Sequence, residues 1–314
     1  MSQLDAQMQT FVERSMECYP SDAVESSAAD QRRWYDDLCK EFSVTRPQGV
    51  IVTNGFVQAP DGHKVSIRRY QIGHQASKVQ IVYAHGGGFV VGDLDSHDDI
   101  CAELAHLSGV DLVAVDYRLA PECNYPDDIN DCLAVVDQLL ADGHQLILAG
   151  DSAGGTLSAC IANARCQFTS SQLLGQVLIY PALAQGVDTP SMNEHAFAPL
   201  LSRADMEYYL PIRIGEGLLP SHDPLYWPMQ GSDLAKLPLT HLFPAEIDPL
   251  RDDCELYADA LRAAGVEVVN HLSAGQGLVH CYLRARHISD KANACFAEIC
   301  EVIRQLAKTN GQVR

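Results

Sequence analysis

The stretch Gly150-Asp151-Ser152-Ala153-Gly154-Gly155 decides the fold of this chain. An apolar run over residues 145–149 predicts a buried strand before it, and the run from Thr156 to Cys166 predicts a helix after it. A chain that turns from strand to helix this sharply holds Ser152 at the apex in a strained conformation. Glycine is expected at 150 and 154 because a Cβ would meet the neighbouring backbone. The G-x-S-x-G pattern in this setting is that of a nucleophile elbow, which presents a serine hydroxyl at the edge of a sheet.

A second glycine-rich motif, His85-Gly86-Gly87-Gly88-Phe89, follows the first buried strand. Consecutive glycines let backbone N–H groups approach a ligand, as an oxyanion hole requires, and esterases carry such a loop before the elbow. Both motifs have a nucleotide-binding alternative. A phosphate loop would need a lysine where Thr156 stands, and a dinucleotide loop would need a glycine in place of Val91. The two motifs together therefore favour ester chemistry.

Composition excludes several classes of partner. The chain has 314 residues and a formal net charge of −19, which argues against nucleic acid and anionic membranes. No apolar run approaches the roughly 20 residues that span a bilayer, and no signal peptide is expected in residues 1–20. The eleven cysteines form no Cys-x-x-Cys pair, so we expect reduced, mostly buried thiols, no metal and a cytoplasmic protein.

The order of predicted elements indicates an α/β chain. Apolar residues recur at helical spacing over residues 4–15 and 34–42, which predicts two helices. Residues 49–57 and 64–72 predict a pair of antiparallel strands. Arg118 and Glu122 are interpreted as buried residues with a structural role. Buried strands and helices then alternate, which predicts a mostly parallel central sheet flanked by helices. The strands are expected at 79–84, 112–116, 146–149, 177–180, 241–245 and 266–271, and the helices at 100–108, 129–141, 156–166 and 252–264.

A proline-rich gap between Pro181 and Trp227 contains no predicted strand, and Ser202 with Asp205 suggests the start of a helix there. The domain organisation expected from these patterns has four segments. Residues 1–46 form N-terminal cap helices, 47–184 and 221–314 form the catalytic domain, and 185–220 form a cap insertion over the site.

These motifs resemble the bacterial hormone-sensitive-lipase family of esterases, within the α/β-hydrolase superfamily. The matching residues are the two glycine-rich motifs, Asp116-Tyr117-Arg118-Leu119-Ala120-Pro121-Glu122, Asp248-Pro249-Leu250-Arg251-Asp252 and His280. The resemblance implies an α/β-hydrolase fold with a helical cap. It implies Ser152 as nucleophile, Asp248 as acid, His280 as base, and the backbone N–H groups of Gly87, Gly88 and Ala153 as the oxyanion hole.

The order Ser, Asp, His also follows from the general pattern of this fold. Among histidines after Asp248, His271 lies in a strand-like run and His287 in a helix-like one, whereas His280 follows a loop at the end of the last strand. Glu246 and Asp252 are rivals to Asp248 as the acid. One departure is Cys281, because the family usually has glycine after the histidine. A thiol there is expected to narrow the space near the reacting ester.

The resemblance implies a carboxylesterase that hydrolyses small esters with short acyl chains through an acyl-enzyme, without a cofactor. An amidase or formamidase on the same triad is one alternative. A non-catalytic ligand-binding receptor on this scaffold is another, and the presence of Ser152, Asp248 and His280 argues against it. The expected partner is a small-molecule ester, and a homodimer is implied by the resemblance alone.

Overall fold

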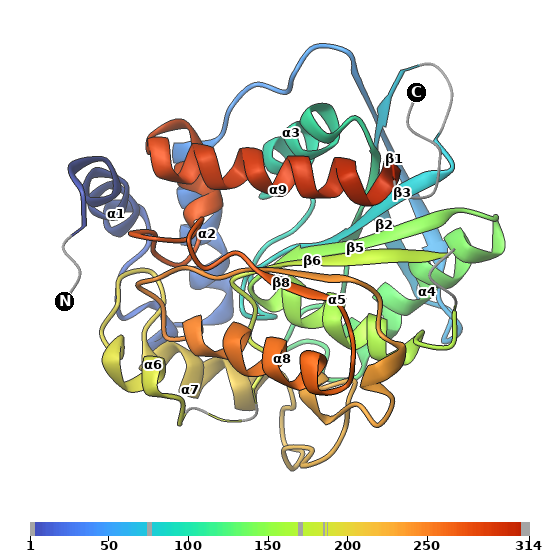
Figure 1. The fold of residues 1–314 in the computed structure, drawn as a ribbon. Coiled ribbons are helices and arrows are strands. Elements are labelled where there is room, and N and C mark those ends of the chain that lie inside the picture. The colour runs from blue at the N-terminus through green and yellow to red at the C-terminus, as the bar shows by residue number, and fades with distance from the viewer. Residues whose placement is uncertain (1–3, 74–76, 169–171, 185, 187, 309–314) are drawn as a thin grey trace.

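The computed structural model describes residues 4–73, 77–168, 172–184, 186 and 188–308. In this part of the chain eight strands form one twisted sheet in the order β1-β2-β4-β3-β5-β6-β7-β8 (Figure 1). Strand β2 pairs antiparallel with β1 and β4, and the pairs from β4 to β8 are parallel. The bounds are β1 Val50–Gln58, β2 Lys64–Ile72, β3 Val79–Ala84, β4 Asp111–Asp116, β5 Gln145–Asp151, β6 Leu173–Ile179, β7 Thr240–Phe243 and β8 Val268–Asn270.

The central strands are apolar throughout because both faces of the sheet are covered. In β3, Ile81 and Tyr83 pack into the core on one face while Val82 and Ala84 pack into the core on the other. Helices α3 (Asp98–Ser108) and α9 (Asp290–Lys308) cover the first face. Helices α4 (Asp127–Ala141), α5 (Ala153–Ala164) and α8 (Arg251–Ala263) cover the second (Figure 1). The predicted parallel sheet between two layers of helices is confirmed.

Helix α9 was not among the helices predicted from the sequence. Its buried residues recur at helical spacing, for example Cys295, Phe296, Ile299 and Ile303, so its amphipathic pattern was readable. Within the residues that the structure describes, no strand follows it to complete a strand–helix alternation. The alternation that identified the other helices therefore did not extend to this one.

Two separate segments of helices lie at one end of the sheet (Figure 1). The first contains α1 (Ala6–Cys18) and α2 (Ala28–Phe42), and the second contains α6 (Pro190–Glu194) and α7 (Arg203–Ile212). The helix start expected at Ser202 is confirmed: Ser202 and Asp205 form a reciprocal capping box at the first turn of α7. The domain boundaries stay a prediction, and Gln185, the predicted start of the insertion, lies outside the described residues.

Two finer expectations were wrong. Strand β7 ends at Phe243 rather than at residue 245, so Asp248 lies in a turn beyond the strand, where Ile247 makes an isolated parallel bridge to Val279. Glu122 is not a buried partner: its side chain is 60% exposed and pairs with Arg32. Arg118, by contrast, is largely buried and binds Asp131, as expected of a structural residue. Within the described residues, no helix is long and apolar enough to cross a membrane.

Candidate active site

Ser152 occupies the turn between β5 and α5 with φ 52° and ψ −121°, a region that residues other than glycine rarely adopt. Its N–H donates to the carbonyl oxygen of Ile179 at 2.8 Å, which anchors the turn to the end of β6. Gly150 and Gly154 flank this turn, and glycine is required at both because a Cβ would meet the neighbouring backbone, as the sequence predicted. A Cβ at Gly150 would collide with the carbonyl oxygen of Gly154, and a Cβ at Gly154 would collide with that of Ala84. The strained turn is thus held by close backbone packing on both sides.

Asp248 follows strand β7 and His280 follows strand β8, and both side chains lie near Ser152. The imidazole Nε2 of His280 lies 2.9 Å from Ser152 Oγ, and its Nδ1 lies 2.6 Å from Asp248 Oδ2. Both side chains are buried, and the second oxygen of Asp248 accepts the N–H of Leu250 at 2.8 Å. An Nδ1–H that donates to the carboxylate leaves the Nε2 lone pair facing the serine hydroxyl, which is the tautomer that a general base requires.

The rival residues have other partners. His271 contacts His241 and Glu298, and His287 contacts Glu103. Among the rival acids, Glu246 accepts the N–H of Gly277 at 2.6 Å in the loop before His280. Asp252 accepts the N–H of Ser191 at 2.7 Å. The fold therefore brings Ser152, His280 and Asp248 together and directs these four side chains elsewhere.

The glycine loop (residues 85–89) lies beside Ser152 and lines the same cavity. Gly87 and Gly88 have φ values of 132° and 59°, which suit glycine, and a Cβ at Gly88 would lie 2.5 Å from the ring of Tyr209. Among the described residues, no acceptor takes a hydrogen bond from the N–H of Gly87 or Gly88. Ala153 also lines the cavity and is the first residue of α5, where backbone N–H groups face outward. The three residues expected to supply oxyanion donors therefore all line the cavity that contains Ser152.

A cavity of about 480 Å³ surrounds Ser152 and His280. Its walls come from the glycine loop, from both segments of cap helices and from the turn that follows Asp248. Most of its lining is apolar or aromatic, and the aromatic residues are Phe11, Tyr19, Tyr35, Phe89, Phe197, Tyr209, Tyr226 and Trp227. A largely apolar cavity is an environment in which hydrogen-bond donors stabilise a developing oxyanion most strongly.

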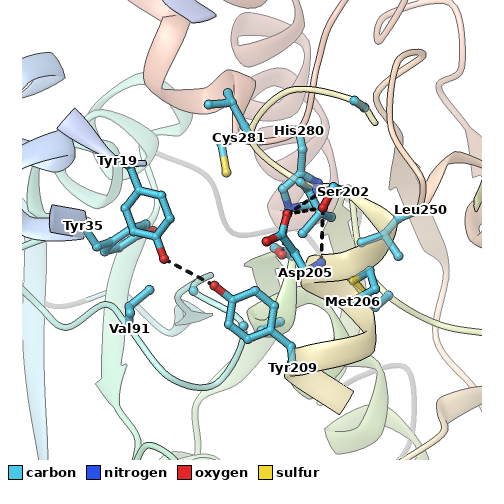
Figure 2. Close-up of a pocket in the computed structure, with 18 of the residues that line it drawn as sticks. Tyr19, Tyr35, Val91, Ser202, Asp205, Met206, Tyr209, Leu250, His280 and Cys281 are labelled. Atoms are coloured by element: carbon cyan, nitrogen blue, oxygen red, sulfur yellow. Dashed lines mark hydrogen bonds between the residues drawn. The ribbon is translucent and has the colours of Figure 1, made fainter. Parts of the chain in front are cut away.

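Tyr19 and Tyr209 connect the two cap segments across this cavity. Tyr19 follows α1 and Tyr209 lies in α7, and their hydroxyl oxygens are 3.5 Å apart and point toward one another (Figure 2). The ring of Tyr209 also packs on Gly88. Burial raises the pKa of Tyr19 to about 12, so this hydroxyl is protonated at neutral pH.

Cys281 lines the cavity directly after His280 (Figure 2). Its φ is 61°, a left-handed conformation in which glycine would be unstrained. Burial raises the pKa of the thiol to about 12, with Arg284 opposing the shift. The thiol is consequently protonated at neutral pH, and the alternative of a reactive thiolate beside the imidazole is not favoured.

Several cavity residues were not assigned to the site from the sequence. Tyr19, Tyr209 and Leu250 lie in it, and so does Trp227, to which the resemblance transferred no role. Tyr209 lies in a helix and the other three lie just outside helices, where an aromatic or aliphatic residue carries no local signal that distinguishes a cavity wall from ordinary core. In the described part of the chain, no three His, Cys, Asp or Glu side chains are grouped so that they could hold a metal ion.

The chain is similar to known α/β-hydrolase proteins. A family model described as alpha/beta hydrolase fold matches residues 81–284. The ethyl acetate hydrolase of Pseudomonas putida is 31% identical over 301 residues, covering 91% of this chain and 92% of that protein. Esterase LipI of Mycobacterium tuberculosis (strain ATCC 25618 / H37Rv) is 39% identical over 218 residues and covers 67% of each chain.

Solved structures are similar along almost the whole chain. A thermostable esterase from Pseudomonas putida ECU1011 superposes with a TM-score of 0.88 at 25% identity, covering 100% of this chain and 99% of that one. A hyperthermophilic esterase from Pyrobaculum calidifontis gives a TM-score of 0.85 at 27% identity and covers 97% and 99% of the two chains. The expected fold class is confirmed by these likenesses together with the sheet topology.

Proposed function

Because the chain belongs to the hormone-sensitive-lipase-like family of α/β hydrolases and is a carboxylic ester hydrolase, we propose that it cleaves small esters through Ser152, His280 and Asp248. The observation that carries this proposal is the hydrogen-bonded series from Asp248 through His280 to Ser152, which opens into a largely apolar cavity. The oxyanion donors in this proposal are the N–H groups of Gly87, Gly88 and Ala153.

The proposed reaction proceeds in two halves. His280 Nε2 takes the proton of Ser152 as its Oγ attacks the ester carbonyl carbon, and the carbonyl oxygen gains negative charge at the three N–H groups. The imidazolium then returns this proton to the alcohol, which leaves, and an acyl-serine ester remains. Water repeats the sequence on the acyl-enzyme and releases the acid. Asp248 keeps the imidazole in the required tautomer and stabilises its positive charge.

The proposed substrates have short, uncharged acyl groups. The cavity walls are mostly apolar, and the ring of Tyr209 lies directly on the oxyanion loop, where it limits the space beside the carbonyl. Within the described residues all eleven cysteines are free thiols, which supports our proposal of a cytoplasmic location, where thiols stay reduced.

Ser152→Ala tests the nucleophile. The variant should fold like the wild type but lose hydrolysis of p-nitrophenyl acetate by at least about 10³-fold in kcat, because removing a triad member leaves only binding and oxyanion stabilisation. Mass spectrometry after treatment with a phosphonate ester should show a covalent adduct on wild type and none on the variant. A variant that still forms the adduct would overturn the assignment of Ser152.

Asp248→Asn tests the acid. The asparagine still accepts the Leu250 N–H, but it favours the wrong imidazole tautomer, and kcat should fall by up to about 10⁴-fold. Asp252→Asn and Glu246→Gln are matched controls, because both remove a nearby carboxylate that does not contact His280. A larger loss in either control than in Asp248→Asn would show that the acid has been misassigned.

A further inference from the structure

The turn that carries Asp248 is held from the cap side by a reciprocal pair of hydrogen bonds. Ser191, in α6, donates its N–H to Asp252 Oδ2 at 2.7 Å, and its hydroxyl oxygen accepts the N–H of Asp252 at 3.1 Å. The same hydroxyl donates to the carbonyl oxygen of Pro249 at 2.7 Å. Ser191 is fully buried. These three hydrogen bonds join Ser191 to Pro249 and Asp252, which closely follow Asp248 in the chain. We call them the Ser191 clasp.

A small apolar cluster strengthens the same connection. Leu250 packs with Met192, Leu201 and Met206, which all belong to the cap insertion. Leu250 also lines the active-site cavity beside Met206 (Figure 2), and its N–H donates to Asp248 Oδ1. The turn that contains Asp248 and Leu250 is therefore packed against the cap insertion as well as against the central sheet.

The sheet side holds the residue before Asp248: an isolated parallel bridge joins Ile247 to Val279, which directly precedes His280. Strand β7 itself ends at Phe243, five residues before Asp248, and the Ser191 clasp holds the residues that follow Asp248. The Asp248 side chain must nevertheless stay within 2.6 Å of His280 Nδ1. A carboxylate on a turn keeps such a contact only when the turn itself is fixed by its neighbours.

We propose that Ser191 is a positioning residue, through which the cap insertion fixes the geometry of Asp248 and thereby sets the turnover rate. The proposal rests on the proposed function of Asp248. Removal of the hydroxyl leaves the N–H of Asp252 and the carbonyl of Pro249 without this partner, and the turn then has more than one available arrangement. Displacements of about 1 Å in a catalytic group can cost 10²-fold in rate. Loosening of the clasp should therefore lower kcat on the order of 10-fold.

The decisive experiment is a double-mutant cycle with p-nitrophenyl acetate as substrate. Ser191→Ala should lower kcat about 10-fold with little change in KM, because the small ester does not touch Ser191. In the Asp248→Asn background the same change should lower kcat less than about 2-fold, since a residue that acts through Asp248 has nothing left to position. An equal loss in both backgrounds would overturn the proposal and indicate a general structural role.

Two further variants separate the alternatives. Ser108→Ala removes another buried hydroxyl, which donates within α3 to Leu104, and should leave kcat unchanged. Asp252→Ala breaks the clasp from its partly exposed side and should reproduce the Ser191→Ala effect even if the latter variant does not fold. Normal turnover in Asp252→Ala would contradict the clasp. If Asp248→Asn itself kept wild-type turnover, the proposed acid, and with it the basis for the clasp, would be wrong.

Discussion

Asp151 Oδ1 accepts a hydrogen bond from the backbone N–H of Gly86 at 2.9 Å, so the residue before Ser152 is joined directly to the glycine loop. The same oxygen accepts the hydroxyl of Tyr83 at 2.7 Å. Burial opposes ionisation of Asp151, but its interaction with the His97 imidazole, the hydrogen bond from Tyr83 and the charge of Arg284 outweigh burial and hold its pKa well below the usual range. Ser152 and the glycine loop are therefore joined through one buried carboxylate.

We expect Asp151→Asn to lower kcat about 10-fold with little change in KM, because an amide cannot accept from both donors with the strength of a carboxylate and the glycine loop loses its alignment. Steady-state kinetics on p-nitrophenyl acetate measure the effect. Tyr83→Phe is the matched control: it removes a donor to the same carboxylate but leaves the Gly86 contact, and its loss should be smaller. Equal losses would indicate that the Gly86 contact has no special role.

Tyr209 should limit the size of the acyl group. Tyr209→Ala removes the ring that lies over Gly88, and the ratio of kcat/KM for p-nitrophenyl octanoate to that for the acetate should rise about 10-fold. Tyr209→Phe keeps the ring and loses only the contact with the Tyr19 hydroxyl, so its ratio should stay near wild type. A uniform loss for every chain length in Tyr209→Ala would mean that the ring only stabilises the fold.

Cys281→Gly should remain active and accept bulkier esters, because the change opens space beside His280 and relieves the positive φ. A thiol with a pKa of about 12 should react slowly with iodoacetamide at pH 7.5, with labelling that rises as pH approaches 9. Peptide mapping of the alkylated enzyme measures this directly. Rapid labelling of Cys281 at pH 7.5, or loss of activity in a folded Cys281→Gly variant, would contradict this interpretation.

Asp253 should make the fold less stable as pH rises. Burial raises its carboxyl pKa to about 7, although the N–H groups of Leu183 and Ala184 oppose the shift. In the unfolded chain this carboxyl has a pKa near 3.8, so between about pH 4 and 7 the native state binds a proton that the unfolded state has lost. The contribution of Asp253 to the free energy of unfolding therefore falls as the pH rises through that window.

Asp253→Asn removes this titration while keeping an acceptor for the two N–H groups. Its melting temperature relative to wild type should therefore increase between pH 5 and pH 8. Asp259→Asn, on the exposed face of α8, is the control and should show no such trend. A difference that stays constant with pH would show that Asp253 is already ionised in the native protein.

Local patterns in the sequence were sufficient for the fold and for the candidate nucleophile. Apolar runs that alternate with amphipathic ones predict a parallel sheet between helices, and the positive φ values of Gly87 and Gly88 belong to one local turn that favours glycine. Such features depend on residues close together in the chain, so they can be read without knowledge of what packs against them. The capping box at Ser202 was predictable for the same reason.

Only the tertiary structure decided which distant side chains meet. Asp248 and Asp252 have the same chemistry and lie four residues apart, yet one turns toward His280 and the other toward Ser191, because the end of β7 and the docking of α6 orient that turn. Tyr19, directly after α1, and Tyr209, within α7, meet across 190 residues of sequence. Periodicity in a sequence specifies which face of a helix is buried. The partner that covers that face is set by the packing of the whole chain.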